Sequence, residues 1–521
     1  MQGLTFEVEE RVAPSAPERA DVACFVGYAR RRPDAPVSAA LSRFLAEAAW
    51  TQGPLARVDP EDPQDPLEDV PLPFETFDAF ARHFAWEARS TEAADGATWL
   101  GAAVRSFFAQ GGRKCYVVVA GDPPAVDASR SARLAALEPL LPVGTTPVDR
   151  STWHGAAHLY GLDDVSFLAL PDLPELTSVD PEPLPLPHPP PPSDPQFVEC
   201  ATGPDDSAPV WHTPERTAPR CDLPGYQQWG DFVRRVTDLL GGGPSHRGGG
   251  HLREVHFIAA LPRPSLDLSV ELPGGKRVAA EQDLGRYLQD NGLFLRFQSA
   301  FAQLVHPWAQ TSGSDGLPEQ LEPMDGVLVG TLARNALLRG AFRSAVGQLV
   351  AEVVQVKPTP TRLDQALHGP GAPLRGLAER VSLVGPTSGG GMRVLSDVTT
   401  SKTEAHRVAP SSRLMAVVLR AARHAGLEHA FNPSGPATWN ALRRRLERVL
   451  QRLYDAGALR GESAREAFEV RCDRTTMTQD DLDNGRLIAR IELDPAAALE
   501  RLRMVLAVAQ DGVAVTQGTG A

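Results

Sequence analysis

The segment 436–453 constrains the fold of this chain more than any other part of the sequence, because it carries an unbroken apolar stripe. Its apolar residues recur at the spacing of one face of an α-helix: Trp439, Leu442, Leu446, Val449, Leu450 and Leu453. Its arginines lie mostly off that face: Arg443, Arg444, Arg445, Arg448 and Arg452. Such a helix buries its apolar side in a domain core and leaves a basic side outside. We therefore predict a helix that begins near Pro436, ends at Gly457 or Gly461, and anchors a C-terminal domain core made of Trp439, Leu442, Leu446, Val449 and Leu453.

Two short strands are predicted after this helix. In the first, three apolar residues alternate with charged ones: Phe468, Val470 and Cys472. In the second, four residues repeat the pattern: Leu487, Ala489, Ile491 and Leu493. Alternation of this kind is typical of a strand with one buried side. The residues between them, 480–485, predict an acidic turn.

Size and composition set the class of protein. A chain of 521 residues with 42% apolar and 22% charged residues is expected to form two to four globular domains. The net charge of −13 argues against a general nucleic-acid binder. Five scattered cysteines, without metal-ligand spacing, indicate folding in a reducing cytosol: Cys24, Cys115, Cys200, Cys221 and Cys472. We expect no membrane insertion, because no run of about 18 apolar residues occurs.

The segments before residue 436 predict alternating strands and helices, and hence an α/β layer. Strands are expected at 22–26, 115–120, 165–170 and 255–260, and helices at 38–50, 99–110 and 284–306. Residues 181–195 are so rich in proline that we expect an exposed, extended loop there. The range 181–250 as a whole is interpreted as this loop plus an insertion.

Several of these segments resemble the contractile tail sheath family. The C-terminal residues that carry the resemblance are 468–476, 480–486, and 431–433 followed by Trp439. The N-terminal ones are 22–27, 104–118 and 162–172. The resemblance also implies a short aromatic helix at 74–86 and a glycine-rich strand at 326–330. The resemblance implies a multi-domain sheath subunit of mixed α/β (α+β) fold, with a C-terminal α/β domain and exchanged terminal strands. We accordingly divide the chain into an N-terminal arm (1–20), an outer domain (21–345), a C-terminal domain (346–498) and a C-terminal arm (499–521).

The two arms are the expected subunit interface. Leu4, Phe6 and Val8 alternate with polar residues at one end, and Met504, Leu506 and Val508 do so at the other. Unpaired strands expose backbone groups, and addition to a neighbour's sheet satisfies them. Two alternatives remain open here: each strand pairs within its own chain, or residues 499–509 form a C-terminal helix, for which the alanine-rich start of the arm has high propensity.

Candidate chemical sites are incomplete. His154 and His158 have zinc-like spacing but no evident third ligand, so we interpret them as a pair on a helix surface. The acidic residues Asp481, Asp483 and Glu492 match the ends of a calcium loop, but Arg486 replaces its essential glycine. The glycine-rich runs lack the lysine and hydroxyl residue of a phosphate loop. We predict no catalytic, cofactor-binding or metal-binding residues, no cofactor and no enzyme activity.

The resemblance also implies a function. Copies of the chain, alone or mixed with sheath paralogues, polymerise helically around an inner tube and contract to drive the tube through a target membrane. Inner tube, baseplate and terminal cap proteins are the implied partners. The implied location is the cytoplasm during assembly, then a phage tail or a released phage-tail-like particle. No direct nucleic-acid contact is expected, and the basic side of the 436–453 helix is interpreted as a solvated or subunit-facing surface.

Two other interpretations stay open at this point. Residues 391–396 and 495–498 depart from the family pattern, which favours a sheath-like adaptor or minor sheath paralogue at one end of the particle. An α/β enzyme with a proline-rich insertion is the further alternative.

Overall fold

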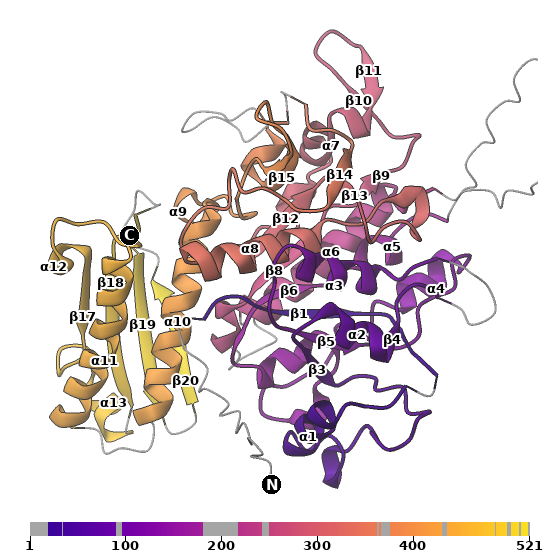
Figure 1. Cartoon of the computed structure of the whole chain (residues 1–521). Helices are drawn as coiled ribbons and strands as arrows, with labels where there is room; N and C mark the ends of the chain where they lie inside the picture. The colour runs from indigo at the N-terminus through magenta and orange to yellow at the C-terminus, as the bar shows by residue number, and fades with distance from the viewer. Residues whose placement is uncertain are drawn as a thin grey trace, which may run out of the picture.

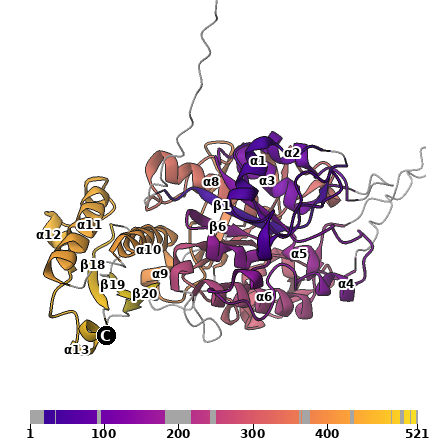
Figure 2. The same cartoon turned by 90° about the horizontal axis from the view of Figure 1, so that it is seen from below.

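The chain forms an α/β body and a smaller C-terminal domain that lies beside it (Figures 1 and 2). The computed structural model describes residues 19–33, 35–89, 96–180, 217–241, 250–361, 364–365, 376–429, 435–484, 486–496, 502–509 and 512–518. The predicted strand with Leu4, Phe6 and Val8, and the proline-rich stretch 181–195, lie outside the described residues. Among the helices that are described, none is long and apolar enough to cross a membrane.

An eight-stranded sheet forms the centre of the body, in the order β16-β15-β12-β8-β6-β1-β5-β3. The six inner strands are parallel, and β3 and β16 pair antiparallel at the two edges. The strands are β1 (Val22–Gly27), β3 (Pro71–Phe74), β5 (Cys115–Val119), β6 (Val165–Ala169), β8 (His256–Ala260), β12 (Ala302–His306), β15 (Val381–Pro386) and β16 (Met392–Val394). Continuous apolar runs such as 22–26 suit strands that are buried on both faces.

Helices cover both faces of this sheet, so each face has its own hydrophobic core. On one face lie α1 (Ala39–Glu47), α2 (Phe77–His83), α3 (Trp99–Ala109) and α8 (Asp325–Arg339). On the other lie α6 (Leu223–Gly241) and α7 (Leu284–Asp290). Helix α6 falls inside the range 181–250 and packs Trp229 and Phe232 into the core. The predicted α/β layer is confirmed.

Two predictions for the body are wrong. Residues 326–330 were predicted as a strand, but they belong to helix α8. Gly326 and Gly330 explain the difference, because they let α8 pack directly against the backbone of α3. A Cβ at Gly326 would lie 2.3 Å from the carbonyl oxygen of Ala103, and one at Gly330 would lie 2.5 Å from that of Phe107.

The second error concerns residues 284–306, which were predicted as one helix. The structure has the short helix α7 and then strand β12, which is inserted between β8 and β15. Its parallel pairing to both neighbours places Leu304 and Val305 in the cores on opposite faces of the sheet. Pairing between segments far apart in the chain therefore overrides the local helical pattern.

The C-terminal domain consists of two long helices over a four-stranded antiparallel sheet of order β17-β18-β19-β20. The helices are α10 (Ala409–His429) and α11 (Pro436–Asp455), and the strands are β17 (Phe468–Arg471), β18 (Leu487–Leu493), β19 (Leu502–Ala509) and β20 (Gly512–Gly518). The structure has α11 as predicted, with Pro436 in its first turn and Gly457 just beyond its end at a φ of +75°. Strand β18 buries every second residue, as its alternation predicts.

The core of this domain collects the apolar stripe of α11. Trp439, Leu442, Leu446, Val449 and Leu453 are all buried there. The alternative of a C-terminal helix over residues 499–509 is wrong, because 502–509 is strand β19. It pairs with β18 of the same chain, which places Met504, Leu506 and Val508 in the same core.

Helix α10 joins the two parts of the molecule through three buried arginines. Arg413 donates to both oxygens of the Asp397 carboxylate, at 2.9 and 2.7 Å. Arg420 donates to Ser166 Oγ at 2.9 Å and to the carbonyl oxygen of Val165 at 2.6 Å, both on β6. Further along the helix, Arg423 pairs with the buried carboxylate of Glu254. The opposite, apolar side of α10 contributes to the C-terminal core.

Two buried carboxyl groups lie near the carboxyl ends of the parallel strands. Asp172 Oδ2 accepts a hydrogen bond from the Tyr28 amide at 3.1 Å, and burial raises the pKa of Asp172 to about 8. Asp325 begins α8, and burial raises its pKa to about 8 as well. Each is therefore protonated in the folded protein at pH values where an unfolded aspartate, with a pKa of about 3.9, is ionised.

Removing mid-stripe side chains from α11 is expected to destabilise the C-terminal domain. We expect Leu446→Ala with Val449→Ala to lower its free energy of unfolding by several kcal/mol, because Leu→Ala alone in a packed core costs about 2–5 kcal/mol. Hydrogen exchange followed by mass spectrometry on peptides from 436–455 reports this domain separately. Gln451→Ala, an exposed change on the same helix, is the control. Unchanged exchange in the double variant would show that the stripe does not hold the domain together.

The stability of the body is expected to fall as the pH rises. Between about pH 4 and pH 8 the unfolded chain releases the Asp325 proton and the folded chain keeps it, so ionisation favours unfolding. We expect Asp325→Asn to raise the Tm relative to the parent, with a larger difference at pH 9 than at pH 6. Asp397→Asn is the matched control. Burial raises the pKa of Asp397, but the Arg413 charge and the hydrogen bonds from Arg413, Ala345 and Gln303 together lower it below its ordinary value, so this variant is expected to lose stability at both pH values. A Tm difference for Asp325→Asn that does not depend on pH would contradict the assignment.

Candidate subunit interface

Strand β17 forms an open edge of the C-terminal sheet. It pairs with β18 on one side, and no strand among the described residues pairs with its other side. Figure 1 shows β17 on the side of the domain that faces away from the α/β body. The strand at the other end of the sheet, β20, lies next to α10. An open edge presents a row of backbone donors and acceptors on which a further strand can pair.

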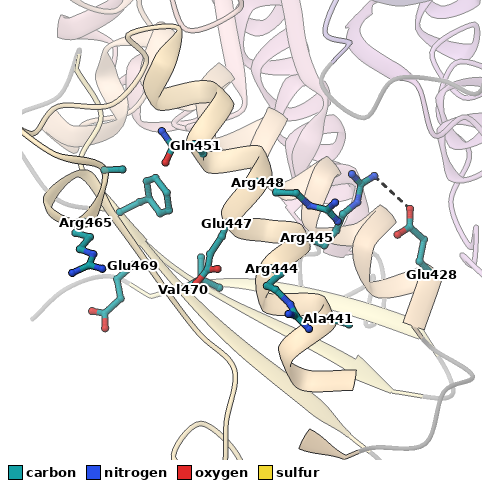
Figure 3. Close-up of a pocket in the computed structure, with 12 residues that line it drawn as sticks. Glu428, Ala441, Arg444, Arg445, Glu447, Arg448, Gln451, Arg465, Glu469 and Val470 are labelled. Atoms are coloured by element: carbon teal, nitrogen blue, oxygen red, sulfur yellow. Dashed lines mark hydrogen bonds and ion pairs between the residues drawn. The ribbon is translucent and has the colours of Figure 1, made fainter. Parts of the chain in front are cut away.

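A groove of about 1070 Å³ runs beside this edge, between α11, β17 and the short helix α12 (Ala464–Ala467) (Figure 3). Phe468, Val470 and Ala441 give it apolar surface. Most of its other lining is charged, from Arg444, Arg445, Glu447, Arg448, Arg465 and Glu469, with Glu428 contributed by α10. The groove therefore combines a free strand edge with a basic helix side.

The charges of the groove are only partly balanced. Arg445 lies 3.5 Å from Glu428, the ion pair drawn in Figure 3. Glu469 is held by Arg471 of its own strand at 2.6 Å. For Arg444, Arg448 and Arg465, no carboxylate of the described chain lies within 4.0 Å of the guanidinium group. Such a groove suits an extended segment with carboxylate side chains, which gains backbone pairing and charge compensation together.

The two histidines singled out in the sequence do not form a surface pair. His158 is buried, and its Nε2 lies 3.2 Å from Asp69 Oδ1. His154 contacts the other oxygen of the same carboxylate through Nδ1, and Arg57 lies 2.5 Å from that oxygen. Burial lowers the pKa of His158 and favours the neutral imidazole. The surface interpretation is therefore wrong for His158, because Asp69 draws both rings together.

The acidic turn carries no calcium geometry. Thr478 and Asp481 form a reciprocal cap on the short helix α13 (Gln479–Asp483), and Glu492 lies on strand β18 opposite Glu469. Across the described ranges, no group of three or more histidine, cysteine, aspartate or glutamate side chains is arranged to hold a metal ion.

The residues predicted for the subunit interface separate into two groups. Met504, Leu506 and Val508 lie on β19, within the chain's own core, so in a single copy they are covered. Leu4, Phe6 and Val8 lie outside the described residues. The groove beside β17 was not predicted. Its sequence signals are the arginines off the stripe of α11 and the charged alternation of β17, but their common position is set by the tertiary structure.

No family model matches this sequence, and no curated protein matches it. Solved structures do. A chain of the anti-feeding prophage (AFP) helical sheath in the contracted state matches with a TM-score of 0.51 and 16% identity, over 96% of each chain. The sheath complex of the extracellular contractile injection system PVC, also contracted, matches with a TM-score of 0.51 and 16% identity, over 95% of this chain and 94% of that chain. A chain of the AFP baseplate matches with a TM-score of 0.53 and 15% identity, over 96% and 97%.

The chain has the fold of contractile sheath subunits. The match extends over the α/β body and the C-terminal domain together, because it covers nearly the whole of both chains. The resemblance drawn from residues 22–27, 104–118 and 468–486 is confirmed at the level of the fold. The open edge of β17 and the adjoining arginine groove are therefore features of a chain with the sheath fold.

Proposed function

We propose that this protein is a structural subunit of a contractile sheath. Copies polymerise helically around an inner tube, and contraction of the polymer drives the tube through a target membrane. The sheath fold along nearly the full chain supports this proposal, and the open β17 edge beside the arginine groove is the observation that carries it. Head-to-tail contacts that do not close on themselves generate a helix, and an open edge in each copy provides such a contact.

The occupant proposed for the groove is the N-terminal arm of a neighbouring copy. Residues 4–10 read Leu-Thr-Phe-Glu-Val-Glu-Glu, an alternation that predicts a strand with an apolar row and an acidic row. In this arrangement its backbone pairs with β17 and its glutamates approach Arg444, Arg448 and Arg465. Residues 1–20 are then an arm donated to a neighbouring copy, and the arm moves together with the body and the C-terminal domain of its own chain.

The C-terminal arm is the second proposed link. In a single chain β19 pairs with β18 through seven residue pairs, from Leu487 with Val508 to Leu493 with Leu502. The same pairs form if β19 is donated to an identical neighbour, so the exchange changes the connection and keeps the contacts. A swap of this kind requires a link that reaches the neighbour, and the proposal assigns this role to the residues between β18 and β19.

The other proposed partners follow from the proposed role as a sheath subunit. An inner tube protein, a baseplate and a terminal cap are proposed to contact this chain in the assembled particle. Assembly is proposed to take place in the cytoplasm, before the sheath becomes part of a phage tail or a released phage-tail-like particle. A purely structural subunit uses no catalytic residue and no cofactor.

A sheath-like adaptor or minor sheath paralogue at one end of the particle is the second candidate. The match to a chain of the AFP baseplate favours it, as do the departures at 391–396 and 495–498 from the sheath pattern. Negative-stain microscopy of the purified protein separates the two roles. Long striated tubes support the main sheath, and isolated rings support the adaptor. A compact monomer with hydrolytic turnover would instead indicate the α/β enzyme.

Deleting residues 1–12 is expected to leave a folded protein that no longer forms tubes, because the arm is donated to another copy. The variant Arg444→Glu with Arg448→Glu is expected to have the same effect, since it repels the acidic arm. Lys276→Glu with Arg277→Glu, an exposed double change on a hairpin of the body, is the charge-matched control. The readouts are the Tm of the monomer and tube formation by electron microscopy.

Restoring the charge pattern gives the sharpest test. In the groove double variant, Glu7→Arg with Glu9→Arg is expected to recover assembly, because the signs of both surfaces are then exchanged. Wild-type tubes from the 1–12 deletion would refute arm donation. Truncation at residue 503 does not test arm donation cleanly, because it removes most of β19 and with it Met504, Leu506 and Val508 from the core.

A further inference from the structure

Arg380 lines a pocket on the α/β body that is separate from the C-terminal groove. The residue follows the 3₁₀ helix η8 (Leu377–Glu379) and precedes β15. The pocket measures about 440 Å³ and is lined by Gln289, Gly292, Phe294, Leu295, Arg380 and Lys402. Its wall is largely apolar, and Leu295 at its rim is 61% exposed.

The guanidinium group of Arg380 is buried without an anionic partner. Only 3% of the residue is exposed, yet no carboxylate in the described part of the chain forms an ion pair with it. Its Nη2 donates to the carbonyl oxygens of Thr400 at 2.8 Å and Phe294 at 3.4 Å, and the group lies 5.3 Å from the Phe294 ring centre. Its Nε is buried and has no hydrogen-bond partner among the described residues.

The charged groups around Arg380 do not compensate for the missing ion pair. Burial lowers its pKa to about 10, and the nearby charge of Arg407 acts in the same direction. Glu379, next in the chain, opposes both effects but makes no ion pair with Arg380. Two other buried arginines have a carboxylate in contact, as Arg89 has Glu175 at 2.8 Å and Arg263 has Glu319 at 2.9 Å. Arg31 differs from them, since its side chain donates to backbone carbonyl groups. A buried charge without a partner is strongly unfavourable, so it indicates a missing anion.

We propose that the Arg380 pocket receives a carboxylate carried by a second copy of this chain, an inference that rests on the proposed sheath assembly. The carboxylate approaches Arg380, with Lys402 and the Gln289 amide as further donors around it. An apolar neighbour of that carboxylate covers Leu295, which is otherwise left in water. Self-association also provides the acidic surface, since each copy has a net charge of −13. This contact joins the α/β bodies of two copies through a specific pair of opposite charges. It is distinct from strand exchange at the C-terminal domain.

The chemistry of the pocket is testable without any assembly. Hexanoate, a carboxylate with a short apolar chain, is expected to raise the Tm of the monomeric protein, and 1-hexanol at the same concentration is not. Arg380→Met is expected to abolish the hexanoate effect and to leave the Tm unchanged or higher, because the unpaired charge is gone. Arg413→Met removes a buried arginine that has a partner, Asp397, and is expected to lower the Tm. No hexanoate effect, or a steep loss of Tm in Arg380→Met, would overturn the proposal.

Assembly decides the source of the carboxylate. Arg380→Met is expected to raise the protein concentration needed for tube formation about tenfold or more, while the folded monomer persists. Normal tubes from this variant, with the hexanoate effect lost, would assign the pocket to a small organic anion and overturn the subunit contact. If the parent protein forms no polymer, the sheath role fails and the subunit contact fails with it. The hexanoate measurement then still decides whether the pocket binds a carboxylate.

Discussion

Helix α10 has to satisfy two different neighbours, and the relative position of the two parts of the chain depends on it. Its apolar side packs with α11 and the C-terminal sheet, while Arg413, Arg420 and Arg423 on the other side enter the body. Removing one partner of a buried pair costs about 3–5 kcal/mol, because the other charge is left unpaired. The arginines therefore specify one docking geometry where an apolar contact alone would tolerate several. Helix α10 therefore belongs to the packing of both parts of the described chain.

The elements that could be predicted from the sequence are those whose pattern is local. The apolar stripe of α11 and the alternation of β18 each predict which side of the element is buried, and those sides are buried in the structure. The errors arise where a contact with a distant part of the chain determines the secondary structure. An apolar run such as Gly326-Val327-Leu328-Val329-Gly330 suits a buried strand or a buried helix equally well. The close approach of α3, which only glycine permits at positions 326 and 330, selects the helix.

The candidate interface was predictable in its parts but not as a whole. The arginines of α11 were placed off the stripe, and β17 was recognised as a strand, yet nothing in the sequence states that β17 ends the sheet. Strand order follows from long-range pairing, which also sets the chain's own β19 beside β18 and covers Met504 and Leu506. The Arg380 pocket gave no sequence signal at all, because an unpaired buried charge is defined by what is missing around it.

The edge strand also explains how such a subunit avoids pairing at random before it assembles. Strand β17 carries Glu469 and Arg471, which pair with each other at 2.6 Å and place charge along the open edge. Charged edges discourage pairing with an arbitrary strand, because an apolar intruder would have to desolvate those charges. In the proposed assembly an acidic strand meets a different surface, since Arg444, Arg448 and Arg465 line the groove in which it pairs. The charged edge thus discourages pairing with arbitrary strands, and the groove favours an acidic one. In the proposed assembly the acidic arm is favoured because it brings both a backbone partner and the complementary charge.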